Sequence, residues 1–257
     1  MLGGQSLAAT PNNGGQSGYI NVPSAVVEAD GTFSAGYSYD SPYGQLWVSS
    51  TILPFLQVTG RYVSIGGIPA FPGQADSYGA GYGRYKDKVL DAKLRLWQED
   101  GSLPAVAIGQ TDLFGTELFG SRYIVATKTF GVDKNIETSL GYGTNRTNGL
   151  FAGARWTPLE LPRWSLVAEY NSLDYTKDYL ASETGAARRH KGPAMALEYR
   201  WGWLGMQVAR NRDQFSANAF VTIPFGEKEY IPKVFEPPYF QDKDPVPPPS
   251  IPEWHRD

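Results

Sequence analysis

The sequence contains no cysteine, which excludes a disulfide framework and thiolate chemistry. No apolar run approaches the roughly 18 to 20 residues that a membrane-spanning helix requires, so a membrane location would demand a closed β-barrel. Histidine is almost absent: His190 lies in a basic loop and His255 near the C-terminus, and no nucleophile has a recognisable partner. We therefore expect neither an enzyme nor a metal or other cofactor. The net charge of −3 argues against nucleic acid as a partner.

Glycine and aromatic residues, in contrast, are abundant. The chain holds 29 Gly, 16 Tyr, 12 Phe and 7 Trp, and its mean hydropathy is −0.35 although 41% of its residues are hydrophobic. This mixture of turn-forming, aromatic and polar residues is typical of many strands joined by turns. No stretch in the middle of the chain has the composition of a linker, so we expect one all-β domain.

The clearest alternation lies between Gly192 and Arg210. In steps of two, one face carries Met195, Leu197, Tyr199 and Trp201, and the other carries Ala194, Ala196, Glu198 and Arg200. After a tight turn at Gly202 and Trp203 the alternation resumes, which predicts a β-hairpin. An apolar face that ends in aromatic residues, opposite a charged face, is typical of a strand between lipid and a polar lumen.

The rest of the chain repeats this pattern. About twelve strands are expected, at residues 32–39, 45–53, 57–66, 88–97, 103–111, 121–131, 136–144, 150–157, 163–174, 192–201, 204–210 and 215–225. The long connections 67–85, 112–120 and 175–191 all follow odd-numbered strands, whereas tight turns follow even ones. The sequence therefore predicts an all-β fold, a closed antiparallel up-and-down transmembrane barrel over residues 31–225. Its long loops would lie outside a Gram-negative cell and both termini in the periplasm, with outer-membrane lipids around it.

Alternation also predicts which side chains face inward and which face outward. A Lys or Arg facing lipid at mid-membrane would cost about 2 to 4 kcal/mol, so charged positions are assigned to the lumen. The lumen-lining residues are expected to be Arg61, Asp91, Lys93, Arg95, Glu137, Arg155, Glu169, Glu198 and Arg200, together with Trp47 and Trp97. The outward aromatic girdles are expected to include Trp156, Trp164, Tyr170, Tyr199, Trp201 and Phe215.

Both ends of the chain differ from the barrel in composition. Residues 1–30 are expected to form a flexible lead with a short extended segment at 18–25, which Pro23 keeps out of a central strand. Residues 1–10 lack the basic start and apolar core of a signal peptide. Residues 226–257 form a Pro-rich tail, expected to be extended and periplasmic, whose aromatic residues Tyr230, Phe235, Tyr239, Phe240 and Trp254 are candidates for docking a partner.

Several segments, taken in order, resemble the YjbH family of exopolysaccharide-associated outer-membrane proteins. They are Gly18–Ala25, Asp30–Ser38, Pro54–Leu56 running into Val58–Tyr62, Lys86–Leu96, Gly109–Asp112 and Gly149–Arg155. The resemblance implies a β-barrel that serves the secretion or assembly of exopolysaccharide or capsule, with a polysaccharide or periplasmic export proteins as partners. It implies no catalytic motif.

Two interpretations of the lumen and three of the function remain open. The mixed charges of the lumen either pair with one another and plug the interior, or form a polar track for a sugar chain or small solutes. The leading hypothesis is a non-enzymatic barrel of exopolysaccharide secretion, whose tail docks the export machinery. A small-solute porin or structural barrel is the alternative. A lipid- or glycan-modifying enzyme, with Glu169 and Glu198 as paired carboxylates, is the third.

Overall fold

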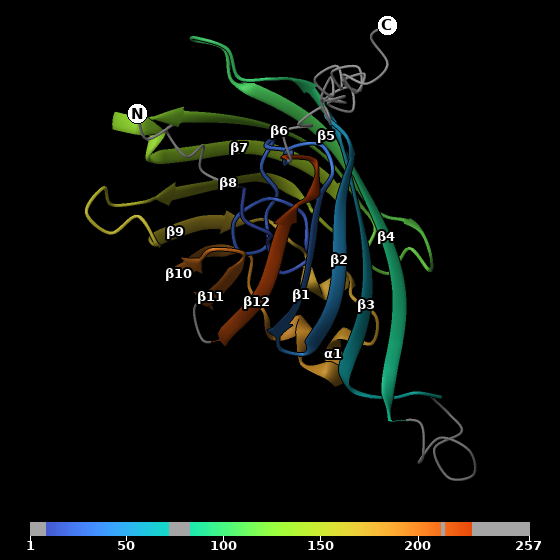
Figure 1. Ribbon diagram of the computed structural model, residues 1–257. Coiled ribbons are helices and arrows are strands. Elements are labelled where there is room, and N and C mark those ends of the chain that lie inside the picture. The colour runs from blue at the N-terminus through green and yellow to red at the C-terminus, as the bar shows by residue number, and fades with distance from the viewer. Residues whose placement is uncertain (1–8, 72–82, 212–213, 228–257) are drawn as a thin grey trace, which may run out of the picture. The chain divides into compact units, whose positions relative to one another are not determined.

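The barrel is closed. The computed structural model describes residues 9–71, 83–211 and 214–227, and within them twelve antiparallel strands pair in sequence order, with β1 against β12 (Figure 1). The strands are β1 (Thr32–Asp40), β2 (Tyr43–Leu53), β3 (Leu56–Pro69), β4 (Arg84–Trp97), β5 (Ala105–Phe114), β6 (Ser121–Phe130), β7 (Ile136–Asn145), β8 (Gly149–Trp156), β9 (Trp164–Asn171), β10 (Gly192–Trp201), β11 (Leu204–Asn211) and β12 (Gln214–Pro224). The predicted fold class is confirmed.

The connections define two ends of the barrel. Those after even-numbered strands lie at what we call the turn end, where Gly202 closes the β10–β11 hairpin with a positive φ of 58°. Those after odd-numbered strands lie at the loop end, and the two longest, residues 70–83 and 172–191, are both there. The predicted sorting of the long loops to one end is confirmed. The loop-end connections 41–42 and 146–148 are nevertheless short.

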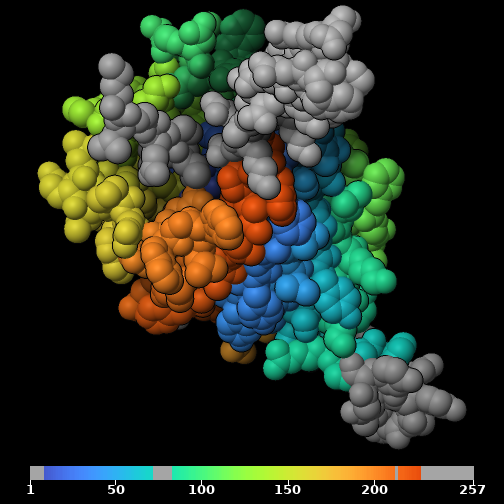
Figure 2. Space-filling view, in the orientation of Figure 1, coloured from blue at the N-terminus to red at the C-terminus, as the bar shows by residue number. Residues whose placement is uncertain are grey.

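The outer face is apolar. Many outward side chains of the strands are large, apolar and about half exposed or more, among them Leu46 (57%), Leu140 (60%), Met195 (71%) and Met206 (59%). Figure 2 shows β10–β12 beside β1–β4 as one unbroken outer face. A soluble protein rarely exposes so large an apolar surface, so this is the exterior of a transmembrane barrel. Among the described residues, no helix has the length and hydropathy to cross a bilayer.

The six predicted girdle residues all lie on this outer face. Trp156, Trp164, Tyr170, Trp201 and Phe215 are 39–63% exposed, and Tyr199 is half-buried because its ring packs 4.7 Å from that of Trp164. Tyr170 and Phe215 lie toward the loop end and the other four toward the turn end. The two groups therefore lie where aromatic belts at the two membrane–water interfaces would be expected. Whether they contact headgroups stays a prediction.

Two expectations are wrong. Residues 9–27, the described part of the expected flexible lead up to Val27, are ordered inside the barrel, where most of them are buried (Figure 1). Trp97 was expected in the lumen but is 54% exposed, because the pairing of β4 with β5 shifts between Arg95 and Trp97 and breaks the alternation there. Trp47 lies inside as expected, 1% exposed. Its face packs on Gly15 and Gly36, where an added Cβ would come within 2.6 Å and 2.4 Å of the indole.

Candidate functional site

The inner wall carries the charges that alternation predicted. Of the nine expected lumen residues, Asp91, Lys93, Glu137, Arg155, Glu169 and Glu198 are at most 4% exposed, and Arg61, Arg95 and Arg200 are partly buried. Buried charges are tolerated only where a partner compensates their lost hydration. The partners therefore determine what this lumen is.

Part of the compensation comes from ion pairs within the wall. Arg61 binds Asp91 at 2.7 Å, and Arg155 binds Glu137 at 2.9 Å and approaches Glu198 at 3.5 Å. These pairs join adjacent or next-but-one strands, so these charges satisfy one another along the wall and do not by themselves span the interior. They leave out Lys93 and Glu169, which lie on opposite walls and reach a third component instead.

That component is residues 9–27, which we call the plug. It forms two tight loops, closed by bridges between Pro11 and Ser17 and between Gly18 and Pro23. Both of its ends lie at the turn end: Arg200, next to the last residue of β10, donates to the carbonyl of Ala9, and Arg95 donates to that of Val27. The plug thus enters and leaves the barrel through the same opening.

Lys93 and Glu169 hold the plug by its main chain. The Lys93 ammonium donates to the carbonyls of Ser17, Ser24 and Val26 at 2.8–3.1 Å. One oxygen of Glu169 accepts the backbone N–H groups of Ile20, Asn21 and Val22 at 2.8–3.1 Å, an arrangement in which consecutive amides bind an anion. The two buried charges and the turning backbone of the plug therefore satisfy one another.

Other wall residues extend this pattern. Arg155 donates to the carbonyl of Gly18 at 2.6 Å, and Gln207 donates to that of Tyr19 at 3.2 Å. Asn218 donates to the carbonyls of Pro11 and Asn12. Side-chain contacts are fewer, such as Thr10 to Glu198 and Tyr123 to Gln16. The wall mainly recognises a polar backbone.

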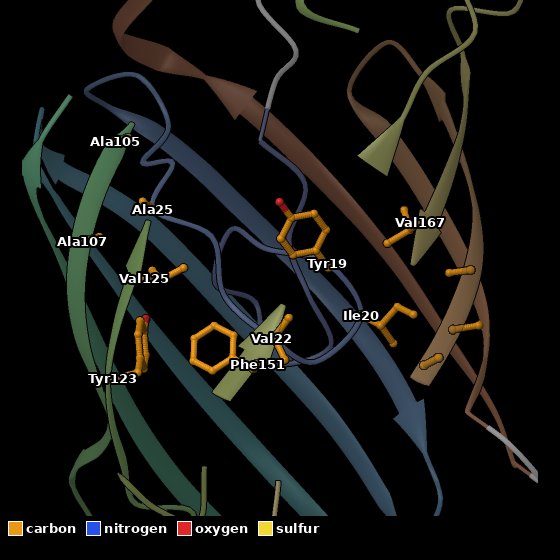
Figure 3. Close-up of a cluster of buried hydrophobic side chains, with 13 residues drawn as sticks. Tyr19, Ile20, Val22, Ala25, Ala105, Ala107, Tyr123, Val125, Phe151 and Val167 are labelled. Carbon is orange, nitrogen blue, oxygen red and sulfur yellow. The ribbon is translucent and has the colours of Figure 1, made fainter. Parts of the chain in front are cut away.

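Apolar packing completes the plug. Tyr19, Ile20 and Val22 point into a cluster with wall residues, among them Tyr123, Val125 and Phe151 (Figure 3). Tyr19 approaches the backbone of β8 so closely that a Cβ at Gly153 would lie 2.2 Å from its ring. Its hydroxyl lies 2.8 Å from that of Ser139. The ring is therefore seated in a gap that only glycine at position 153 leaves open.

The loop end is closed by a second segment, the β9–β10 connection 172–191, which we call the lid. It contains η3 (Tyr175–Lys177), α1 (Ala181–Thr184) and η4 (Ala186–Arg188). It crosses the mouth, because Arg189 binds Asp40 of β1 at 2.6 Å and α1 contacts β3 on the far side. Tyr175, Ala181 and Ala186 pack there with Val63 and Ile65 of β3.

Arg146, in the β7–β8 connection, lies at the centre of the lid contacts. It binds Asp178 through two hydrogen bonds of 2.7 and 2.8 Å, and Asp178 also accepts a hydrogen bond from the Tyr43 hydroxyl. Its guanidinium lies 5.3–5.6 Å from the ring centres of Tyr43, Phe119 and Tyr175. Arg146 thus joins the lid to the wall through both charge and aromatic contacts.

The titration of these loop groups reflects their burial and pairing. Burial alone would lower the pKa of Arg146, but the carboxylate of Asp178 and its hydrogen bonds raise it above the ordinary value. Burial would likewise lower the pKa of Arg189, which Tyr175 and Asp40 raise. Burial raises the pKa of Tyr175 to about 12, although the charge of Arg189 opposes the shift. These groups keep their charge states across the physiological range.

A polar cavity of about 370 Å³ opens beside the lid. Its lining includes Gln110, Ser121 and Asn145 from the strands and Lys177 and Asp178 from the lid. A second space, of about 30 Å³, lies where Asn21 of the plug faces Arg146 and Tyr175. That volume suits about one water molecule. The plug and the lid therefore nearly meet inside the barrel.

Sequence reasoning found the wall but missed what occupies it. The first part of the plug was interpreted as flexible because residues 1–17 are rich in Gly, Asn and Gln, and residues 18–25 were expected only to be extended and outside the barrel. One signal in the sequence could have revealed the plug. The charges predicted to face inward outnumber their obvious partners on neighbouring strands, and Lys93 and Glu169 are too far apart in the sequence to be assigned to each other. The expected docking residues Tyr230, Phe235, Tyr239, Phe240 and Trp254 lie outside the described residues. Within the described residues, no group of three or more His, Cys, Asp or Glu side chains is arranged to hold a metal.

Comparison with known proteins identifies the family. The family model YjbH, described as "Exopolysaccharide biosynthesis protein YbjH", matches residues 10–149 and 145–256. The chain belongs to the YjbH family. The lipoprotein YjbH of Escherichia coli (strain K12) is 31% identical over 202 residues, which cover 76% of this chain and 26% of that protein. The chain thus spans about a quarter of the length of the curated relative it matches.

Solved structures give only a remote likeness. The KdgM porin in complex with disordered oligogalacturonate is 10% identical with a TM-score of 0.47, over 76% of this chain and 99% of the porin. A mutant of the Rh. blastica porin is 9% identical with a TM-score of 0.32, over 71% of this chain and 55% of the porin. The fold assignment rests on the strand pairing of the chain itself.

Proposed function

We propose that this chain is an outer-membrane barrel component of exopolysaccharide secretion or assembly that works without catalysis and without a permanently open pore. Membership of the YjbH family supports the process, and the apolar exterior supports the location. The observation that carries the proposal is the occupied lumen: residues 9–27 fill the barrel and the lid closes its loop end. The protein then acts through partners or through a change of state.

The difference between the two ends of the barrel supports an orientation in the membrane. Long loops gather at the end opposite the start of β1 and the end of β12, so the turn end faces the periplasm and the lid faces outward. The chain on either side of the barrel, including the Pro-rich tail with Tyr230 and Trp254, is then periplasmic. There its aromatic residues dock proteins of the export machinery, while outer-membrane lipids surround the strands.

The absence of catalysis is supported by what the candidate carboxylates already bind. Glu169 accepts three backbone amides of the plug, and Glu198 accepts Thr10 and lies near Arg155. Paired carboxylates of a glycosidase need one group free to protonate a glycosidic oxygen and the other free to face the sugar. With the plug in place, these two are engaged by the chain itself.

Two measurements test the proposal. In planar bilayers the full chain is expected to show no steady conductance, whereas a steady open channel would establish the porin alternative. In a host that makes exopolysaccharide, deletion of the gene is expected to reduce the polymer recovered outside the cell, and the wild-type gene restores it. Unchanged polymer in the deletion strain would exclude the assigned process.

A further inference from the structure

We infer that the inner wall is a binding track for an extended, hydroxyl-rich polymer, a linear polysaccharide, and that residues 9–27 occupy this track in the polymer's place. This deepens the proposed function and rests on it for the choice of polymer. The plug leaves the track through the turn end, and the sugar chain takes over its contacts with the wall.

The first argument is that the wall recognises a backbone. Lys93 contacts three carbonyls and Glu169 three amides, and Arg155, Gln207 and Asn218 each contact further carbonyls. Such contacts do not depend on a particular side-chain sequence. A sugar hydroxyl both donates and accepts, so it can replace an N–H group on Glu169 or a C=O group on Lys93.

The second argument is the aromatic surface that the plug covers. Trp47 packs against Gly15, Tyr123 donates its hydroxyl to Gln16, and Phe151 lies in the cluster around Tyr19. Ligand sites typically combine apolar and aromatic walls with a few well-placed polar groups. Withdrawal of the plug uncovers rings and hydrogen-bonding groups on one continuous surface.

The third argument is that the charged groups of the track need hydrogen-bonding partners. Lys93 is 0% exposed and Glu169 is 4% exposed, and both lose their hydrogen bonds when the plug leaves. Once the plug is gone, water or a polar ligand has to take over these hydrogen bonds, because a charge that stays buried and unsatisfied is strongly unfavourable. A hydroxyl-rich ligand restores those hydrogen bonds, so the polymer and the plug compete for one site.

The fourth argument is the route of exit. Ala9 and Val27, the two ends of the plug, both lie at the turn end, near Arg200 and Arg95. The segment can therefore be withdrawn as a loop, without threading a chain end past the lid. Only the side of the barrel assigned to the periplasm has to open for this step.

A reversible lock tests the inference in the full chain, which has no cysteine of its own. The Cβ position at Gly153 lies 2.6 Å from the first ring carbon of Tyr19, one bond from its Cβ, so the two Cβ positions are within reach of a disulfide. The double variant Tyr19→Cys/Gly153→Cys, when oxidised, ties the plug to β8. Ser34→Cys/Thr222→Cys, whose hydroxyls lie 3.0 Å apart on β1 and β12, is the control that staples the wall only.

Binding of maltohexaose and of a mannuronate hexamer to the purified proteins is measured by calorimetry. The reduced lock variant and the oxidised control are expected to bind at least one hexamer, and the oxidised lock variant is expected to lose that binding and regain it on reduction. Equal binding by the oxidised lock variant would place the sugar elsewhere. Absence of binding by both the wild-type chain and the reduced variant would also overturn the inference.

A second readout follows the plug itself. A single Ile20→Cys thiol, buried in the plug, is expected to react with a water-soluble maleimide several-fold faster when the bound hexamer is added. A Val63→Cys thiol, buried under the lid, is expected to keep its rate. Equal rates for Ile20→Cys with and without sugar would contradict displacement. Because these measurements use purified protein, they are independent of whether deletion of the gene changes exopolysaccharide in cells.

Discussion

The plug and the lid close the same lumen by different chemistry. The plug is held mainly through its backbone, by Lys93, Glu169 and other wall side chains. The lid is held through its own side chains: Asp178 and Arg189 form ion pairs, and Tyr175 stacks with both Arg146 and Arg189. Backbone contacts can be exchanged for those of another polar polymer, whereas side-chain ion pairs select one partner. The difference identifies the plug as the replaceable closure and the lid as the specific one.

Weakening the plug and the lid together should have the largest effect, a change in conductance. A chain carrying Glu169→Ala and Asp178→Ala loses the carboxylate that binds the plug and the one that binds the lid. We expect steady single-channel conductance in planar bilayers from the double variant and near silence from each single variant, because either closure blocks the lumen. Conductance from one single variant equal to that of the double variant would show that only one segment seals the barrel.

Loss of the ion pair between Arg146 and Asp178 should have the next largest effect, on the local stability of the lid. Asp178→Ala leaves the buried guanidinium of Arg146 without its carboxylate, and breaking a buried pair in this way typically costs about 3 to 5 kcal/mol. Hydrogen exchange in residues 172–191 should accelerate accordingly. Asp174→Ala is the matched control, because its pair with Lys177 is largely exposed and such pairs contribute about 0 to 1 kcal/mol. Similar acceleration in both variants would refute the central role of Arg146.

Loss of the Glu169 anchor should loosen the plug, and by less where a hydrogen-bond acceptor is kept at position 169. Glu169→Ala deletes the acceptor of three amides, and hydrogen bonds to a charged group contribute about 1.5 to 3 kcal/mol each, of which the amides regain part by binding water. We expect faster exchange at Ile20, Asn21 and Val22, and unchanged exchange in the lid. Glu169→Gln keeps a neutral acceptor, so its effect should be smaller. An effect of Glu169→Gln as large as that of Glu169→Ala would mean that the carboxylate charge alone holds the plug.

The same contrast explains what could be predicted from the sequence. The barrel was predictable because lipid and lumen impose a two-residue period that is visible in any one strand, as at Leu197 and Glu198. The inward charges followed from the same rule. The plug was not predictable, because its contacts join residues such as Ile20 and Glu169, which are 149 positions apart. Most of these contacts use backbone groups of the plug, and backbone groups leave no pattern in the sequence. Trp97 was misplaced because a register shift is a property of two strands paired together.

The smallest effect should come from acid acting on the lid. Hydrogen bonds from Thr176, and then the charge of Lys177, lower the pKa of Asp174 below its ordinary 3.8, although slight burial opposes the shift. A carboxyl whose folded pKa is depressed stabilises the fold above its unfolded pKa, and this contribution disappears as the pH falls through the folded value. We therefore expect the Thr176 amide to exchange relatively faster only below about pH 4, after correction for intrinsic rates, and by less than about 1 kcal/mol because the group is solvent-screened. Asp174→Asn keeps an acceptor for Thr176 but cannot titrate, so its corrected exchange should not depend on pH in this range. If that variant shows the same acid response, the response arises from another group of the lid.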